Sequence, residues 1–108
     1  MSPQVFQILL SLADRTLHGY AIIQDIRART DGAMSLTAST LYAALRRLLD
    51  AGLIDELDAR PDDDDPRRRY YRITPKGRAA GRAEAARLER LTAMARDKRW
   101  LPAKRSPR

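Results

Sequence analysis

The 108-residue sequence has no cysteine and a single histidine, His18. Without cysteine there is no disulfide, no thiolate zinc site and no cysteine nucleophile, and this composition fits a reducing, cytoplasmic setting. One histidine is too few for a histidine-based zinc site. The carboxylate pair Asp55–Glu56 has neither a glycine-rich loop nor a histidine beside it. We therefore expect no metal, no cofactor and no enzymatic activity.

Long hydrophobic runs are also missing. Near the start of the chain the apolar stretch Ile8-Leu9-Leu10 ends at Ser11, far short of the roughly 20 residues that span a bilayer. No basic segment precedes this stretch, so we expect neither a signal peptide nor a membrane contact. Hydrophobic residues still make up 44% of the chain and charged residues 32%, which is enough for one small folded domain.

Apolar residues recur with helical spacing in three segments of the first half. Residues 3–13 form the first segment, and residues 19–30 form the second, which stops before Gly32. The third begins at the hydroxyl-rich residues 37–40, which suit a helix cap, and ends near Gly52. The core-facing positions are Val5, Ile8, Leu9 and Leu12, then Gly19, Ile22, Ile23 and Ile26, and finally Leu41, Ala44, Leu45 and Leu48.

The second half of the chain changes its period. Residues 53–59 and 69–74 alternate in the manner of two strands, and the turn-rich, acidic residues 60–66 join them as a hairpin. Thr74 followed by Pro75 is typical of a helix start, and we expect a helix from there to about residue 99. The apolar stripe of this helix is thin and consists of Ala85, Leu88, Leu91 and Ala95.

The order helix, helix, helix, hairpin, helix predicts a mainly α fold with a small β-hairpin: a winged helix-turn-helix with an appended C-terminal helix. We expect a DNA-binding domain over residues 1–74, a dimerisation helix over residues 75–100 and a basic, flexible tail over residues 101–108. The third helix would be the recognition helix, and the hairpin would be the wing. A partner helix is the simplest cover for the thin stripe, which predicts a homodimer.

Three segments in this order resemble the PadR family of transcriptional regulators, in its small subclass with a single C-terminal helix. They are Leu17-His18-Gly19-Tyr20 with Ile23; Thr40-Leu41-Tyr42 with Leu45, Leu48 and Gly52-Leu53-Ile54; and Arg67-Arg68-Arg69-Tyr70-Tyr71-Arg72-Ile73-Thr74 with Gly77. The chain departs from the family at Ala38-Ser39, where members usually have Pro-Gly. The resemblance implies a cytoplasmic homodimer that represses transcription from palindromic operators. In some members it also implies control by an aromatic or amphipathic effector bound between the subunits.

The exposed face of the third helix carries groups that suit double-stranded DNA. Arg46 and Arg47 can donate to guanine acceptors in the major groove, and Ser39, Thr40 and Tyr42 can donate to phosphates. A solvated helix face is the alternative for the two arginines, and packing against the wing is the alternative for the tyrosine. Their place in a helix-turn-helix favours DNA contact.

The hairpin offers a second set of cations. Arg67, Arg68 and Arg69 begin its second strand, where they can lie along a DNA backbone or minor groove, and we expect one or two of them to do so. The aspartates at 62–65 offer another interpretation, a charge-balanced wing tip. These aspartates lack the alternating spacing, the glycine and the distal glutamate of a calcium loop. Tyr20, at the start of the second helix, is either a core residue or a phosphate donor.

We expect the first and last helices to form the dimer contact. The candidate contact residues are Val5, Phe6, Leu9, Leu88, Leu91 and Ala95. Trp100, the single tryptophan, follows the last helix and could stack on a flat effector at the interface, although a plain packing or exposed role is as well founded. Gly19 would permit the close approach of two helices.

The net charge of +7 comes from the last third of the chain. Residues 1–74 hold 10 basic and 11 acidic residues, a net charge of −1, whereas residues 76–108 hold 11 basic and 3 acidic residues, a net charge of +8. The DNA-contacting half must therefore rely on a few well-placed arginines, while the last helix and tail attract polyanions at long range. The alternative function is a winged-helix protein-interaction module whose basic tail binds polyanions without sequence preference.

Overall fold

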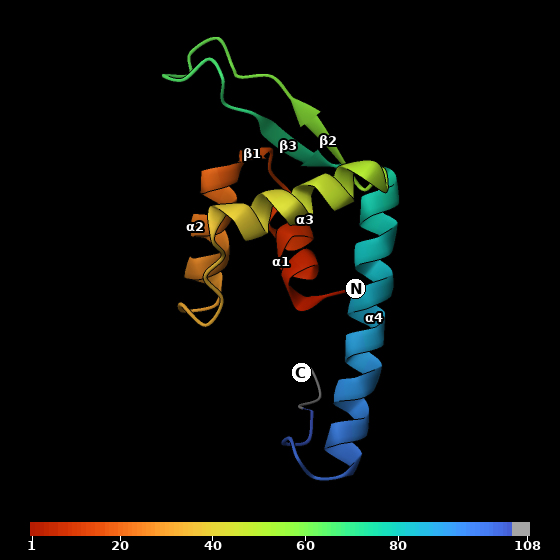
Figure 1. Cartoon of the computed structure of the whole chain (residues 1–108). Coiled ribbons are helices and arrows are strands. Elements are labelled where there is room, and N and C mark those ends of the chain that lie inside the picture. The colour runs from red at the N-terminus through yellow and green to blue at the C-terminus, as the bar shows by residue number, and fades with distance from the viewer. Residues whose placement is uncertain (105–108) are drawn as a thin grey trace.

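The structure is a computed structural model that describes residues 1–104 and contains four helices with a small sheet at one edge (Figure 1). In chain order the elements are α1 (Pro3–Ser11), β1 (Leu17–His18), α2 (Gly19–Arg29), α3 (Ala38–Asp50), β2 (Ile54–Leu57), β3 (Tyr70–Ile73) and α4 (Pro75–Asp97). This arrangement confirms the expected mainly α, winged helix-turn-helix fold with an appended helix. No helix within residues 1–104 is long and apolar enough to cross a membrane.

Side-chain caps fix where the helices begin. The hydroxyl of Thr37 accepts a hydrogen bond from the amide of Thr40 at 3.2 Å at the start of α3, and the hydroxyl of Thr74 accepts one from the amide of Gly77 at 3.0 Å at the start of α4. Such caps satisfy amides that the helix itself leaves unpaired. Both helix starts lie where the sequence predicts them.

Two helix ends differ from the expectation. α1 ends at Ser11 rather than at residue 13. α4 ends at Asp97 rather than at about residue 99, because Arg99 adopts a left-handed conformation with φ of 63° and the amide of Trp100 turns back to the carbonyl of Ala95 at 2.9 Å. This turn closes α4 in the manner of a Schellman motif, although glycine is the usual residue there.

The sheet has one strand more than the sequence predicts. Its order is β1-β3-β2, and both pairs are antiparallel. The expected hairpin is present, with strands shorter than the alternating segments. The additional strand β1 pairs Leu17 with Tyr71 and His18 with Tyr70, so that the start of α2 is fastened directly to the wing.

The core lies between α1, α2, α3 and the sheet. Its most deeply buried side chains are Ile8, Leu12, Ile22, Ile26, Leu41, Leu45 and Ile54. Burial of each contributes about 1.5–3 kcal/mol relative to exposure. The expected stripes of the first three helices therefore face one another, and their outer faces stay free for other contacts.

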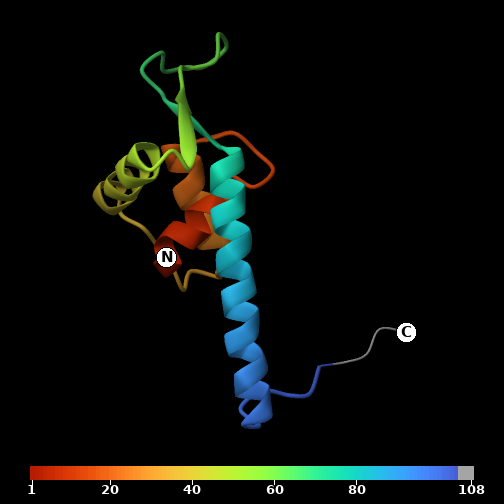
Figure 2. The same ribbon diagram turned by 90° about the vertical axis from the view of Figure 1, so that its right-hand side faces the viewer.

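α4 starts inside this structure and then leaves it. Its first turn packs against Leu53 and Ile73 through Gly77, and its first half lies along α1. The second half projects from the rest of the molecule (Figures 1 and 2). The structure as a whole therefore measures 52 Å in its longest dimension and only 31 Å and 28 Å in the other two. The thin stripe of α4 is thus left uncovered in a single chain, with Leu91 47% exposed.

Candidate nucleic-acid interface

The outward face of α3 presents five of the predicted site residues. Ser39, Arg46 and Arg47 are exposed, Tyr42 is half exposed, and Thr40 is partly covered. At the first turn the hydroxyl of Thr37 lies 2.9 Å from that of Thr40, so several hydroxyl groups gather at the helix start. Ala43, between the two ends of this face, is small and exposed, so the backbone of α3 can approach a partner closely.

A polar groove of about 330 Å³ joins α2, α3 and the wing. Five of the predicted site residues line it: Tyr20, Tyr42, Arg67, Arg68 and Arg69. Tyr20 is 65% exposed, which excludes the core role that the sequence left open. The fold therefore brings tyrosine hydroxyls and guanidinium groups together from positions up to 49 residues apart in the chain.

Arg46 lies beside this groove rather than in it. It lines a neighbouring hollow of about 290 Å³ together with Tyr42, Glu56 and Tyr71. Tyr42, which belongs to α3, borders both hollows and so lies between them. Arg47 lines neither hollow, and its side chain leaves α3 about 100° around the helix axis from that of Arg46. The two arginines therefore address different parts of any partner.

The contact between Gly19 and Tyr42 sets the floor of the groove. A Cβ atom placed on Gly19 would lie 2.6 Å from the hydroxyl oxygen of Tyr42 and 3.0 Å from its ring carbon. Only glycine therefore allows the Tyr42 side chain to rest against the start of α2. This is the close helix approach that the sequence predicts at Gly19.

His18 connects the start of α2 to the wing. Its Nδ1 accepts a hydrogen bond from the amide of Ala21 at 3.2 Å, and its ring meets that of Tyr70 edge to face with centroids 5.5 Å apart. Burial lowers the pKa of His18, and the nearby charge of Arg68 acts in the same direction. The neutral imidazole therefore caps the start of α2. No group of histidine, aspartate or glutamate suited to a metal occurs in the part of the chain that the structure describes.

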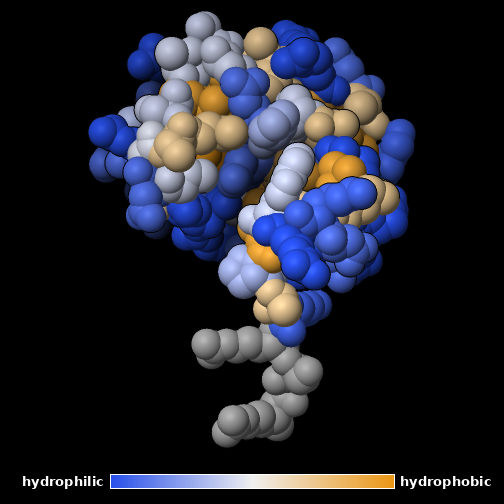
Figure 3. Space-filling model, turned by 90° about the horizontal axis from the view of Figure 1, so that it is seen from below, coloured by the Kyte–Doolittle hydropathy of each residue, from blue (hydrophilic) through white to orange (hydrophobic). Residues whose placement is uncertain are grey.

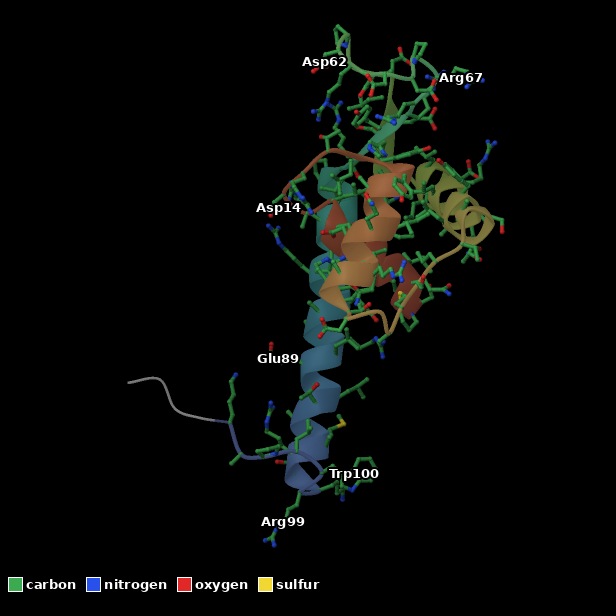
Figure 4. All side chains as sticks on the ribbon, turned by 90° about the vertical axis from the view of Figure 1, so that its left-hand side faces the viewer. Asp14, Asp62, Arg67, Glu89, Arg99 and Trp100 are labelled. Carbon is green, nitrogen blue, oxygen red and sulfur yellow. The ribbon has the colours of Figure 1, made fainter. Side chains whose placement is uncertain are left out.

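The wing arginines are paired with carboxylates. Arg67 lies 3.3 Å from Asp65 and Arg68 lies 3.6 Å from Asp63. Arg69 approaches two carboxylates, Glu56 at 3.6 Å and Asp58 at 3.9 Å. The arginines that line the polar groove are thus the same arginines that pair with the carboxylates of the wing. Figure 4 shows Asp62 and Arg67 together at the tip of the wing.

An apolar groove of about 220 Å³ lies between α1 and α4. Phe6, one of the predicted dimer-contact residues, lines it together with Ala85 of the thin stripe of α4. Leu10 lines it too, although it is not among the predicted contact residues. Val5, Leu88, Leu91 and Ala95 remain at least partly exposed. Leu9 is different, because only 3% of it is exposed; it belongs to the core of its own chain and could meet a partner only as the floor of the groove. Viewed from the end of α4, hydrophobic surface (orange) is exposed between hydrophilic patches (Figure 3).

Trp100 lies at the opposite end of the molecule from the wing (Figure 4). Its side chain is 81% exposed. Leu101 and Lys104 follow without regular secondary structure, and residues 105–108 of the expected flexible tail lie outside the described residues. A ligand held at Trp100 could therefore influence the wing only through the arrangement of whole chains, not through direct contact.

Sequence reasoning missed the parts of this interface that depend on contacts across the fold. β1 is too short to show a period, and the aspartates gave no sign of which ones face an arginine. Asp65 lines the polar groove, and Asp63 is held by Tyr70, seven residues away, in a hydrogen bond of 2.5 Å.

Comparison with known proteins agrees with this architecture. The model of the "Transcriptional regulator PadR-like family" matches residues 8–83. A relative from Lysinibacillus sphaericus, designated "Uncharacterized protein X", is 35% identical over 72 residues; the match covers 67% of this chain and 65% of that protein, just under two thirds of its length.

Two solved structures are similar over most of the chain. A transcriptional regulator from Clostridium thermocellum has a TM-score of 0.75 at 33% identity, over 88% of this chain and 87% of that one. A PadR family transcription regulator from Clostridium difficile has a TM-score of 0.76 over 89% and 97%, but at 21% identity this likeness shows the fold alone. The family match over most of the chain is decisive: this protein belongs to the PadR-like family of transcriptional regulators, which bind DNA and are not enzymes.

Proposed function

We propose that the chain is a sequence-specific DNA-binding repressor that binds a palindromic operator as a homodimer. One observation carries the proposal: the polar groove that gathers three tyrosines and three arginines lies directly beside the exposed face of α3. A helix that can enter a major groove and a cationic surface that can follow the backbone next to it are the two parts that a winged helix needs.

Base recognition is assigned to α3. Arg46 and Arg47 are exposed, and within residues 1–104 neither takes part in an ion pair, so their guanidinium groups are available for guanine O6 and N7. The small side chain of Ala43 lets the helix lie deep in the groove. Ser39 and Thr40 at the helix start suit phosphate contacts, which position the protein without reading sequence.

The wing and the start of α2 are assigned to the DNA backbone. Tyr20 and Tyr42 present hydroxyl groups along the polar groove, and Arg67, Arg68 and Arg69 present cations. Such contacts supply affinity at low salt and set the register of α3 on the duplex.

The dimer is assigned to α1 and α4. The apolar groove between these helices and the uncovered stripe from Ala85 to Ala95 form one continuous face in a single chain. Contact between two such faces would remove Leu88 and Leu91 from water. A two-fold dimer would also set two copies of α3 about 34 Å apart, as successive major grooves require.

An effector would act on this dimer. A small aromatic or amphipathic molecule stacked on Trp100 between subunits would change the separation of the two copies of α3 and release the operator. The 81% exposure of Trp100 supports this role, since a large aromatic face stays open to solvent within residues 1–104.

The proposal is tested with a duplex selected by the protein from random DNA. Binding of the full chain is followed by fluorescence anisotropy. Arg46→Ala should lower the affinity about tenfold or more, whereas Arg90→Ala, the same change on the outer face of α4, should lower it far less. Equal losses would contradict the assignment of α3. Binding without sequence preference would favour the polyanion-binding interaction module instead.

A further inference from the structure

The wing of this protein, residues 54–73, carries more negative than positive charge, with seven carboxylates and five arginines. Each of the three arginines at 67–69 has a carboxylate within 4.0 Å: Asp65 for Arg67, Asp63 for Arg68, and Glu56 and Asp58 for Arg69. Among residues 1–104, by contrast, no ion pair involves the arginines of α3. The base-contacting helix is therefore free to bind, while the backbone-contacting wing is already neutralised.

Asp63 is fixed in place by contacts that its partner arginine does not provide. Its carboxylate accepts hydrogen bonds from the hydroxyl of Tyr70 at 2.5 Å and from the amide of Arg60 at 2.5 Å, and only 9% of the side chain is exposed. The Arg60 guanidinium lies 4.8 Å from the centre of the Tyr70 ring, which holds the loop against the sheet. Asp63 therefore stays beside Arg68 and cannot swing away when a phosphate approaches.

The charge state of Asp63 follows from the same contacts. The hydrogen bond from Tyr70 lowers the pKa of Asp63, and the Arg60 amide and the Arg68 charge act in the same direction. The carboxylate is therefore ionised at neutral pH, which keeps its attraction for Arg68.

Asp65 occupies the polar groove itself. Its carboxylate accepts from the amide of Arg67 at 2.9 Å and from the Nε of the same residue at 3.3 Å. Because it lines the groove together with the three arginines, it faces the position that a DNA phosphate would take. A negative group at this position repels any phosphate that arrives without first separating the ion pair.

We propose that Asp63 and Asp65 are specificity-determining residues that hold the wing arginines back from non-specific DNA. A phosphate contact by Arg67 or Arg68 requires exchange of a carboxylate partner for a phosphate. On DNA of random sequence this exchange gains little free energy, because α3 makes no base contacts that would hold it in the major groove. On the operator, base contacts of α3 keep the backbone against the wing, and the exchange becomes favourable. This inference rests on the proposed DNA-binding function of α3 and the wing.

The loop contains its own matched control. Asp62 and Asp64 are exposed, and within the described residues they take part in no ion pair or side-chain hydrogen bond. The double variants Asp63→Asn/Asp65→Asn and Asp62→Asn/Asp64→Asn change the net charge of the same loop by the same amount. Only the first pair frees Arg67 and Arg68.

The experiment measures affinity of the full chain for a fluorescent, mixed-sequence duplex of about 30 base pairs over a range of NaCl concentrations. Because the arginine of each pair remains partly open to solvent, the ion pairs are weak, and Asp63→Asn/Asp65→Asn should tighten this non-specific binding by about three- to tenfold. Asp62→Asn/Asp64→Asn should have only a small effect. The slope of log affinity against log salt should steepen by about one to two, since each newly neutralised phosphate adds about 0.9. On a selected operator the gain should be smaller, so that the ratio of specific to non-specific affinity falls.

Equal effects of the two double variants would overturn the proposal, because the loop would then act only through its total charge. An unchanged affinity for the mixed-sequence duplex would overturn it too. Asp65→Asn alone, which leaves the Tyr70 contact intact, decides the matter if the double variant loses its fold by circular dichroism. A parent chain that binds no duplex at any salt concentration would instead refute the proposed function itself.

Discussion

Gly77 has the least room for a side chain among the glycines of the structure. A Cβ atom on Gly77 would lie 2.0 Å from the carbonyl oxygen of Leu53, 2.8 Å from Cγ1 of Ile73 and 3.0 Å from the carbonyl carbon of Leu53. Two of these atoms belong to the backbone, so no rotation of a side chain can relieve the clash. Gly77→Ala must push the first turn of α4 away from the preceding turn.

The size of the effect follows from what holds that turn. The amide of Thr74 donates to the carbonyl of Leu53 at 3.1 Å, its hydroxyl donates to the carbonyl of Gly52 at 2.7 Å, and Lys76 donates to the carbonyl of Ala51 at 2.9 Å. Overpacking costs about 1–3 kcal/mol, and each lost hydrogen bond costs about 1 kcal/mol more. The higher helix propensity of alanine returns about 1 kcal/mol. We expect a net loss of about 2–4 kcal/mol.

Urea unfolding followed by circular dichroism measures this loss. Gly81→Ala is the control, because apart from its own stretch of helix no atom of the described residues lies within 4 Å of its Cβ position, and the substitution should stabilise α4 by about 0.5–1 kcal/mol. Both variants are compared with the parent at one protein concentration, since the stability of the proposed dimer would depend on concentration. A Gly77→Ala variant as stable as the parent would refute the packing of α4 against the residues before β2.

Three further predictions concern the interface and the dimer. Gly19→Ala should displace the Tyr42 hydroxyl, which would lie 2.6 Å from the new methyl group, and weaken operator binding in anisotropy titrations without changing the oligomeric state. The pKa of His18 is lowered in the folded chain, so the unfolded chain binds more protons as the pH falls below about 6.5. The free energy of unfolding should therefore decrease at low pH. His18→Gln should remove this part of the pH dependence in urea unfolding. Leu91→Asp should give a folded monomer by sedimentation, because Leu91 is 47% exposed within one chain, whereas Ala93→Asp on another face of α4 should leave the dimer intact; a dimeric Leu91→Asp variant would place the contact elsewhere.

Local sequence signals were sufficient for the helices and the fold. Thr37 and Thr74 mark helix starts because a hydroxyl side chain caps amides only three residues away, a relation that lies within one short segment. The stripe of α3 likewise predicts which side faces the core, and Leu41 and Leu45 are fully buried. Such short-range rules do not depend on the rest of the fold.

Long-range contacts were beyond the sequence pattern. β1 exists only because β3 lies beside it, and two residues carry no periodic signal. The sequence pattern assigns Leu9 both to the core-facing stripe and to the dimer contact, and the packing of α1 places it in the core. The partners of Arg67 and Arg68 depend on how the loop folds back onto Tyr70, which the spacing of charges along the chain does not determine.

Selection of bound sequences from random duplex DNA by the full chain tests the central claim most directly. The account predicts an enriched inverted repeat whose half-site centres lie about 10 base pairs apart, the spacing that two copies of α3 about 34 Å apart impose. It also predicts that the double variant Arg46→Ala/Arg47→Ala loses this enrichment. The account would be contradicted if no sequence were enriched, or if the double variant selected the same repeat as the parent chain.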